Sequence, residues 1–420
     1  MAGQALGIPG GQVRIIKPYR DGGCGNKRDA VYEPLCAWLT TQLGGRTVKI
    51  ECSREETFTC NRVRHAIRSH IISWVRPDGT FAARKLECWS NQGGYASHGD
   101  GICAKGMNSF PQIYPCENRE CDAWTAYTNL PPAGAMRGYG IPQATFAGEA
   151  HIDDVAKALN MNPLERRRRI ATPKGYKDEF AKNVNWSDSF RACMEAGAKA
   201  TDVERLHAEY SKPQTGDIRR GVGMALYWYN TGVWPISLES SSCRMVLNQD
   251  GSLQVQTGET EIGQGCDTAY AQMAADAVGV PFESVHVVST QDTDVTPYGS
   301  GAYASRQTYV GGFAISKTGR ILREKILNYA HKLTRLPVSN LDLVEGKLIR
   351  TPDGEALMSL AELATEALYS MEDSRHITAE ATAQIKSNAY SFGCSYAEVE
   401  VDMKLCKVKV LRLMNVHDCG

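Results

Sequence analysis

Short runs of alternating apolar and polar residues predict β-strands in the first quarter of the chain. Early strands are predicted over Val13–Ile16 and Thr47–Cys52. A clearer hairpin joins Ile71–Val75 to Thr80–Trp89 through the turn Arg76-Pro77-Asp78-Gly79. Proline, aspartate and glycine favour such a turn.

Two further strand pairs are predicted in the second half of the chain. Cys243–Leu247 and Ser252–Gln256 flank the turn Asn248–Gly251. Another pair lies between Tyr396 and Val416, with a break near Met403-Lys404.

Apolar residues spaced at i, i+3, i+4 and i+7 predict amphipathic helices between these strands. Three helices are supported in this way, by Ile152, Val155, Ala156 and Leu159; by Tyr270, Met273, Ala274 and Ala277; and by Leu322, Ile326, Tyr329 and Leu333. Because strands and long helices alternate, the predicted fold class is α+β, with mixed α/β sheets and helices. The polar stretch Ala198–Arg219 is the predicted boundary, which divides the chain into domains 1–210 and 211–420.

The composition of the chain excludes some classes of function. Lys plus Arg and Asp plus Glu both number 47 in 420 residues, so the net charge is zero. Nucleic-acid and acidic-membrane binding need a strong positive field, and neither is predicted. No apolar run is long enough to span a membrane and no signal peptide is visible, so we expect a cytoplasmic protein.

Fourteen cysteines are scattered along the chain without any CxxC pair. Zinc ribbons, thioredoxin-like motifs and ferredoxin-type cluster loops therefore lack support. We expect reduced thiols that pack as small apolar side chains. The chain starts in a Gly-Pro loop and stops at Asn415–Gly420, just after a predicted strand, so we expect a middle piece of something longer or a subunit completed by others.

Four small-residue loops are the candidates for chemistry. Asp21–Lys27 follows a strand and contains three glycines, which suits close approach of an anion or a bulky cofactor or merely a flexible turn. Gly134–Gln143 places Arg137 before a helix, where its planar fork can meet a phosphate or oxo group, or simply solvent.

The other two loops also precede helices. Thr257–Thr268 predicts an anion cradle of helix-start amides, with Asp267 or Thr268 as an ordinary helix cap the alternative. Gly299–Thr308 supplies small residues and hydroxyls that suit a phosphate-bearing ligand. The run Arg166–Arg169 is interpreted as a solvated or subunit-facing helix end, since Glu165 adjoins it and the net charge is zero.

Together, the order and separation of these loops resemble the molybdenum-binding subunit of xanthine dehydrogenase, within the molybdenum hydroxylases, and the bacterial branch fits best. The family's GGGFGNK loop corresponds to Asp21–Lys27, and its AxRGxGxPQ loop to Ala135–Gln143. Its GxTExGQG loop corresponds to Gly258–Gly265, and its ASxxS-like loop to Ala304–Thr308.

The resemblance implies two molybdopterin-binding domains, the second lacking its C-terminal part, and a pterin-linked molybdenum centre. It implies oxidative hydroxylation of hypoxanthine or xanthine with oxygen from water, and electron transfer to iron–sulfur and FAD centres on partner subunits and then to NAD. It places Cys24, Arg137 and Ala304 around the metal as pocket lining without direct ligation. It implies that the cofactor is held by Gly23, Cys24, Gly25, Arg137, Gly263, Gln264, Gly265, Ala304 and Ser305, and that substrate is contacted by Arg28, Tyr139 and Trp234.

The sequence also departs from the family pattern. Cys24 replaces the phenylalanine of the first loop, and Arg28 stands where animal purine-oxidising relatives carry a substrate-contacting glutamate. The family's general base is the glutamate of a Gly-Glu-Pro-Pro motif that this chain does not contain, so the base is expected outside these residues. Alternatives are a hydroxylase for an aldehyde, an N-heterocycle or an aromatic thioester, or an inert remnant that only binds sister subunits.

Overall fold

The computed structural model describes residues 2–25, 27–178, 183–234, 239–288 and 291–420. The chain forms two compact units. Unit 1 comprises residues 1–23, 27–51 and 231–389, and unit 2 comprises residues 24–26, 52–230 and 390–420. Both contain mixed sheets and helices, which confirms the predicted fold class.

Unit 1 is organised around a four-stranded sheet in the order β13-β7-β8-β9. Its strands are β7 (Glu239–Leu247), β8 (Leu253–Thr257), β9 (Val285–Val287) and β13 (Thr378–Ile385). A three-stranded antiparallel sheet contains β10 (Leu341–Val344), β11 (Lys347–Arg350) and β12 (Glu355–Ser359). The helices are α1 (Ala2–Leu6), α2 (Glu33–Gln42), α9 (Cys266–Val278), α10 (Gly312–Thr334) and α11 (Leu360–Tyr369).

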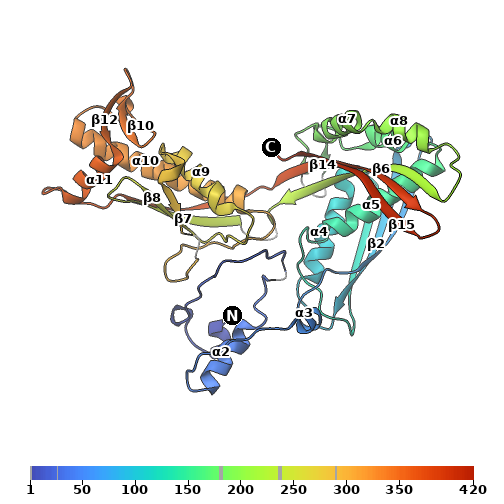
Figure 1. Cartoon of the computed structure of the whole chain (residues 1–420), viewed down its shortest axis with the longest axis horizontal. Coiled ribbons are helices and arrows are strands. Elements are labelled where there is room, and N and C mark those ends of the chain that lie inside the picture. Colours follow the sequence, from blue (N-terminus) through green and yellow to red (C-terminus); the bar gives the residue numbers. More distant parts are fainter. Residues whose placement is uncertain (1, 26, 179–182, 235–238, 289–290) are drawn as a thin grey trace. The chain divides into compact units, whose positions relative to one another are not determined.

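Helices α9 and α10 lie side by side against the strands of the four-stranded sheet (Figure 1). Their predicted apolar faces supply fully buried side chains, among them Tyr270, Leu322 and Ile326, which pack with Met245 and Val255. A single π-helical turn at Gln307–Gly311 leads directly into α10.

Unit 2 contains two three-stranded sheets and a two-stranded ribbon. The first sheet has the order β1-β2-β3, with β1 (Ile67–Val75), β2 (Phe81–Gly93) and β3 (Arg119–Tyr127). The second has the order β15-β14-β6, with β6 (Ile218–Thr231), β14 (Ala389–Asp402) and β15 (Lys407–Asp418). The ribbon pairs β4 (Lys177–Asp178) with β5 (Asn183–Val184).

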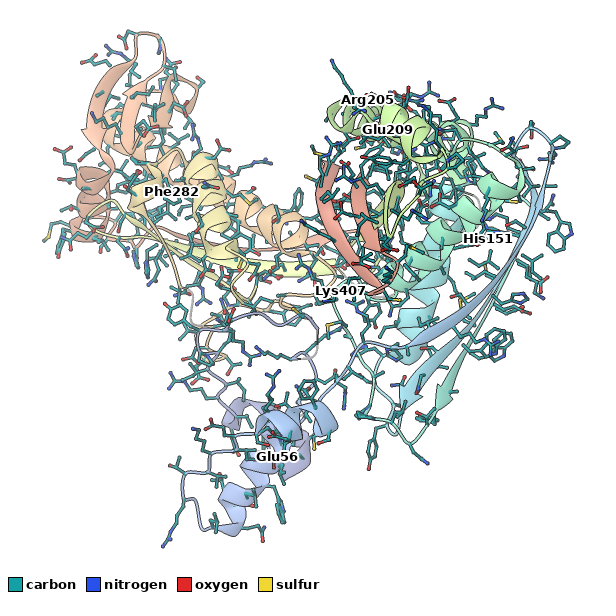
Figure 2. The ribbon with its side chains drawn as sticks, turned by 45° about the vertical axis from the view of Figure 1, so that its right-hand side comes forward. Glu56, His151, Arg205, Glu209, Phe282 and Lys407 are labelled. Carbon is teal, nitrogen blue, oxygen red and sulfur yellow. The ribbon has the colours of Figure 1, made fainter. Side chains whose placement is uncertain are left out.

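The helices of unit 2 are α3 (Arg54–Cys60), α4 (Gly99–Ile113), α5 (Ile141–Ala158), α6 (Pro163–Ile170), α7 (Ser189–Thr201) and α8 (Val203–Tyr210). Of these, α4 and α5 contact the first sheet, and α7 contacts β15 of the second. Helix α4 links β2 to the parallel strand β3, and α5 packs beside α4. His151 of α5 hydrogen-bonds Ser73 of β1 through Nε2 and Oγ at 2.9 Å, so α5 covers the inner face of this sheet (Figure 2).

All three predicted strand pairs and all three predicted helices are present in the structure. The predicted strands over Val13–Ile16 and Thr47–Cys52 are wrong. The first forms only an isolated bridge between Ile16 and Asp292, and the second has no regular structure. Alternation alone does not make a strand, because a strand needs a partner to satisfy its backbone groups.

The interpretation of Arg166–Arg169 as a solvated helix end is wrong for its first half. Arg166 and Arg167 are fully buried within unit 2. Residues 198–219, predicted as a polar boundary, contain the end of α7, α8 and the start of β6 inside unit 2. The division into domains 1–210 and 211–420 stays a prediction.

All fourteen cysteines are free, as predicted. Half of them are buried, namely Cys88, Cys103, Cys116, Cys193, Cys243, Cys266 and Cys394. Cys24 is among the exposed cysteines, so its thiol is not packed as a small core side chain. No helix in the described parts of the chain has the length and apolar character needed to cross a bilayer.

Candidate functional site

In unit 1 the loop before α9 is shaped by two glycines. Gly263 has φ +98° and Gly265 has φ +84°, a left-handed conformation that favours glycine. Both glycines and Gln264 are exposed. A Cβ atom added at Gly265 would meet no heavy atom within 4 Å, so open space lies beside this backbone.

The helix-start amides of α9 are partly occupied by the chain's own Glu261. Its carboxylate accepts hydrogen bonds from the backbone N–H of Gly263 (2.7 Å), Gly265 (3.1 Å) and Asp267 (3.1 Å). The N-cap residue of α9 is Gly265, and Asp267 and Thr268 lie inside the helix, so the prediction that one of them is the cap residue is wrong. A negative charge also suits the positive end of the helix dipole.

Partial burial disfavours the charged form of Glu261, but the three backbone hydrogen bonds outweigh it and hold the pKa of this carboxyl below its ordinary value. A depressed pKa in the folded state stabilises the fold above the ordinary carboxyl pKa. That contribution is lost as the pH falls through the folded pKa.

We therefore expect the Glu261→Gln variant to be less stable than the wild type at pH 7, and the difference to shrink near pH 3. Urea unfolding followed by circular dichroism at both pH values measures this. Glu366→Gln, an exchange of an exposed carboxyl on α11, is the matched control. A stability difference for Glu261→Gln that is the same at both pH values would contradict this role.

The loop Gly299–Thr308 is joined to the loop before α9. Gln307 donates from Nε2 to the Thr260 carbonyl at 2.7 Å and also contacts the Gln264 side-chain amide. Ala304 and Ser305 have φ values of 49° and 55°, which are strained for residues with a Cβ atom.

Two other predicted residues lie beside these loops. The backbone N–H of Gly22 donates to the Ile262 carbonyl at 2.6 Å, which places Gly23 next to the loop before α9. The Arg28 guanidinium lies 4.3 Å from the centre of the Tyr303 ring, a cation–π contact. Trp234, the other predicted residue of unit 1, accepts a hydrogen bond at its carbonyl from the Asn388 side-chain amide. Unit 1 thus brings together Gly23, Arg28, Gly263, Gln264, Gly265, Ala304 and Ser305.

Unit 2 contains the remaining predicted residues. Gly25 has φ +101°, and a Cβ there would lie 2.6 Å from the Ala135 carbonyl oxygen, so glycine permits this contact. Gly25 and its neighbour Cys24 therefore lie beside the loop that carries Arg137 and Tyr139.

The Arg137 loop is held by side chains that the sequence did not single out. Arg64 donates from Nη2 to the Arg137 carbonyl at 2.6 Å. The Arg137 side chain is exposed. Tyr139 Oη lies 3.0 Å from His98 Nδ1. A basic residue facing a loop carbonyl has no sequence signature, because the pairing joins positions 73 residues apart.

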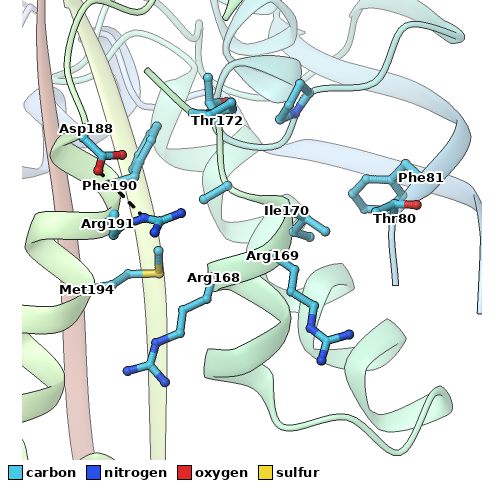
Figure 3. A pocket seen from close by; sticks show the side chains of 13 residues that line it. Thr80, Phe81, Arg168, Arg169, Ile170, Thr172, Asp188, Phe190, Arg191 and Met194 are labelled. Carbon is cyan, nitrogen blue, oxygen red and sulfur yellow. Dashed lines mark ion pairs between the residues drawn. The ribbon is translucent and has the colours of Figure 1, made fainter. Parts of the chain in front are cut away.

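A separate cavity of about 240 Å³ lies in unit 2, between the end of α6 and the start of α7 (Figure 3). Arg168, Arg169 and Arg191 line it, with Asp188 3.8 Å from Arg191. Arg168 is already paired with Glu165, Glu195 and Glu204. None of the predicted site residues lines this cavity.

Two family models, both described as molybdopterin cofactor-binding domain, match residues 1–171 and 196–420, and the second alone spans more than half of the chain. The chain belongs to the molybdopterin cofactor-binding family. It is 44% identical over 422 residues to the xanthine dehydrogenase molybdenum-binding subunit of Escherichia coli O157:H7, covering 100% of this chain and 56% of that protein. This chain thus spans little more than half the length of that relative.

More distant members share the same scaffold. The carbon monoxide dehydrogenase large chain of Hydrogenophaga pseudoflava is 25% identical over 440 residues, covering 99% of this chain and 54% of that protein. The crystal structure of quinoline 2-oxidoreductase from Pseudomonas putida 86 matches with a TM-score of 0.90 at 23% identity, covering 100% of this chain and 56% of that one. This structural likeness shows the shared fold.

The residues of this chain fit a molybdopterin. Open space beside Gly265 allows a ring to approach the backbone, and the N–H groups of Gln264 and Cys266 have no hydrogen-bond partner in the described part of the chain. Among described residues, the one cluster with metal-ligand spacing is Glu261, Cys266 and Asp267. Burial raises the pKa of the Cys266 thiol, and the Glu261 carboxylate accepts the backbone N–H of Gly263.

Proposed function

We propose that the chain is the molybdopterin-binding part of a xanthine dehydrogenase, acting on hypoxanthine and xanthine. The observation that carries this proposal is the 44% identity over the whole chain to a subunit named for that activity. The joined loops of unit 1 support it, because they expose glycine backbone and unpaired amides in one place.

In this proposal the cofactor is held by Gly23, Cys24, Gly25, Arg137, Gly263, Gln264, Gly265, Ala304 and Ser305. Of these, Cys24, Arg137 and Ala304 line the surroundings of the metal without ligating it. Arg28, Tyr139 and Trp234 contact the substrate. When bound, the molybdenum–molybdopterin group supplies the oxidation that places a water-derived oxygen on the purine ring.

The remaining components lie outside this chain in the proposal. Electrons pass to an iron–sulfur subunit, then to an FAD-binding subunit and NAD, in a cytoplasmic heteromeric enzyme. The general base is also expected elsewhere, because the buried glutamates here are engaged. Glu149 pairs with Arg167, while Glu239 and Glu259 pair with Arg306.

The experiment is a substrate assay of the chain purified with its neighbouring gene products. Urate formation from xanthine with an artificial electron acceptor is the expected result, and the chain alone is expected to be about 10²–10⁴-fold slower for want of the base. An aldehyde and nicotinate are tested in parallel. Turnover of either one without turnover of xanthine or hypoxanthine would contradict the proposed substrate class. Full activity of the chain alone would contradict the proposal that the general base lies outside this chain.

Gly265→Val tests the proposed pterin contact. A β-branched side chain would fill the open space beside the backbone, so we expect a several-fold loss of molybdenum and pterin with near-normal helix content. Gly354→Val is the matched control, because Gly354 has φ +73° and also has no heavy atom within 4 Å of the added Cβ. Both variants carry the cost of about 1–2 kcal/mol for a left-handed non-glycine residue. Equal molybdenum content in the two variants would contradict the assignment.

A further inference from the structure

The loops of unit 1 meet at a fully buried arginine. Arg306 follows the strained pair Ala304 and Ser305, and its side chain is 0% exposed. Its Nε donates to Glu239 Oε2 at 2.6 Å, and its Nη1 donates to Glu259 Oε1 at 2.6 Å. Both carboxylates are also fully buried. One guanidinium therefore bridges two acidic side chains 20 positions apart in sequence.

The two acidic partners of Arg306 belong to different segments of the chain. Glu259 stands in the loop before α9, which carries Gly263, Gln264 and Gly265. Glu239 begins β7, and its Oε1 accepts the backbone N–H of Val233 at 2.5 Å. Arg306 also donates from Nη2 to the Ser240 carbonyl at 2.5 Å. The Arg306 side chain thus contacts both neighbouring segments at once.

A second layer of hydrogen bonds joins the same segments. Gly232 donates its backbone N–H to the Ala304 carbonyl at 2.8 Å. Gln307, next to Arg306, bonds the Thr260 carbonyl of the loop before α9. Tyr270 of α9 donates from its hydroxyl to the Gln307 carbonyl at 3.2 Å. Left-handed residues such as Ala304 and Ser305 persist only where their surroundings determine the backbone.

We infer that Arg306 is a positioning residue, whose guanidinium fixes the Ala304–Ser305 turn and the loop before α9 in the one arrangement that accepts molybdopterin. This inference rests on the proposed function. The guanidinium suits the task because its planar fork donates to several acceptors at once, and a lysine ammonium cannot reproduce that geometry. Burial of all three charges removes water as a competing partner.

The first test variant is Arg306→Lys, in the chain purified with its neighbouring gene products. It keeps the charge and loses the fork, so we expect molybdenum and pterin content to fall by about tenfold. Amide hydrogen exchange of peptides covering residues 258–265 and 303–308 is expected to become faster, with other parts of unit 1 unchanged. Exchange reports the local order of the backbone whether or not cofactor is bound.

A milder variant covers the case in which Arg306→Lys fails to fold. Both Glu239 oxygens accept N–H donors, so Glu239→Gln must lose one bond while leaving Arg306 in place. It should change molybdenum content and loop exchange in the same direction by a smaller factor. Arg167→Lys is the matched control, because Arg167 is an equally buried arginine that also pairs with two carboxylates, in unit 2.

The outcomes separate this inference from the proposed function. Wild-type molybdenum content and unchanged loop exchange in Arg306→Lys and Glu239→Gln would overturn the positioning role. So would a loss of molybdenum no greater than in Arg167→Lys, accompanied by unchanged loop exchange. If the wild-type complex carries no molybdenum, the proposed function fails, and exchange of the two loops alone then decides whether Arg306 orders them.

Discussion

Gly140→Ala is expected to destabilise unit 2 by about 2–5 kcal/mol, the sum of a left-handed backbone penalty and an overpacking penalty. Gly140 has φ +92° and immediately precedes α5. An added Cβ would lie 2.1 Å from the Ile102 carbonyl oxygen and 3.2 Å from the Gly106 backbone nitrogen. Both atoms belong to the backbone of α4, so neither can move without shifting the helix.

Gly216→Ala is the matched control for this exchange. Gly216 has φ +88° in the same unit, and its added Cβ would meet no heavy atom within 4 Å. It therefore carries the backbone penalty without the clash. Urea unfolding of both variants measures the difference, and equal losses would show that the contact between α4 and the start of α5 is looser than described. Because Gly140 ends the loop carrying Arg137 and Tyr139, its variant should also disturb that loop.

Arg167→Met is expected to cost about 3–5 kcal/mol, because it leaves a buried carboxylate without its partner. Arg167 donates from Nε to Glu149 Oε2 at 3.0 Å and from Nη1 to Asp153 Oδ1 at 2.6 Å. Glu149 also accepts the backbone N–H of Leu226 at 2.9 Å, which ties α5 to β6. The double variant Arg167→Met with Glu149→Gln should recover much of the lost stability, since the stranded charge is then gone.

The stability of Arg167→Met at acidic pH gives a second test of the Arg167–Glu149 pair. Burial raises the pKa of Glu149 despite the opposing charge of Arg167. Without Arg167 this carboxyl would be protonated more readily, so the stability loss should be smaller at acidic pH than at neutral pH. Arg205→Met, which breaks an exposed pair with Glu209 on α8, should barely change stability (Figure 2). A loss equal to that of Arg167→Met would contradict the importance of burial.

Periodicity predicted the parts of the fold that are held by local patterns. The hairpins at β1–β2, β7–β8 and β14–β15 carry tight turns, and the helices α5, α9 and α10 carry continuous apolar faces. The stretch 47–52 has the right alternation, and its residues alternate between exposed and half-buried, but it pairs with no strand in the described structure. A strand's partner is a tertiary property, which alternation does not encode.

Charged residues were the harder part of the sequence to interpret. Arg166 and Arg167 look like a solvated basic run, yet both are buried, because partners from α5 and the β1–β2 turn surround them. Glu261 accepts hydrogen bonds from three backbone N–H groups that are near it in sequence, so this interaction is local. The position of Glu261 before a glycine-rich helix start could have predicted it. The ion pairs of Arg306 span 67 and 47 positions, beyond the reach of any spacing rule.

The central claim is that these 420 residues form the molybdopterin-binding part of a molybdenum hydroxylase. Its most direct test is the molybdenum and pterin content of the chain purified with its neighbouring gene products. We expect about one molybdenum and one pterin for each chain, because each of the four small-residue loops occurs once in the sequence. A correctly folded complex that contains neither molybdenum nor pterin would contradict it.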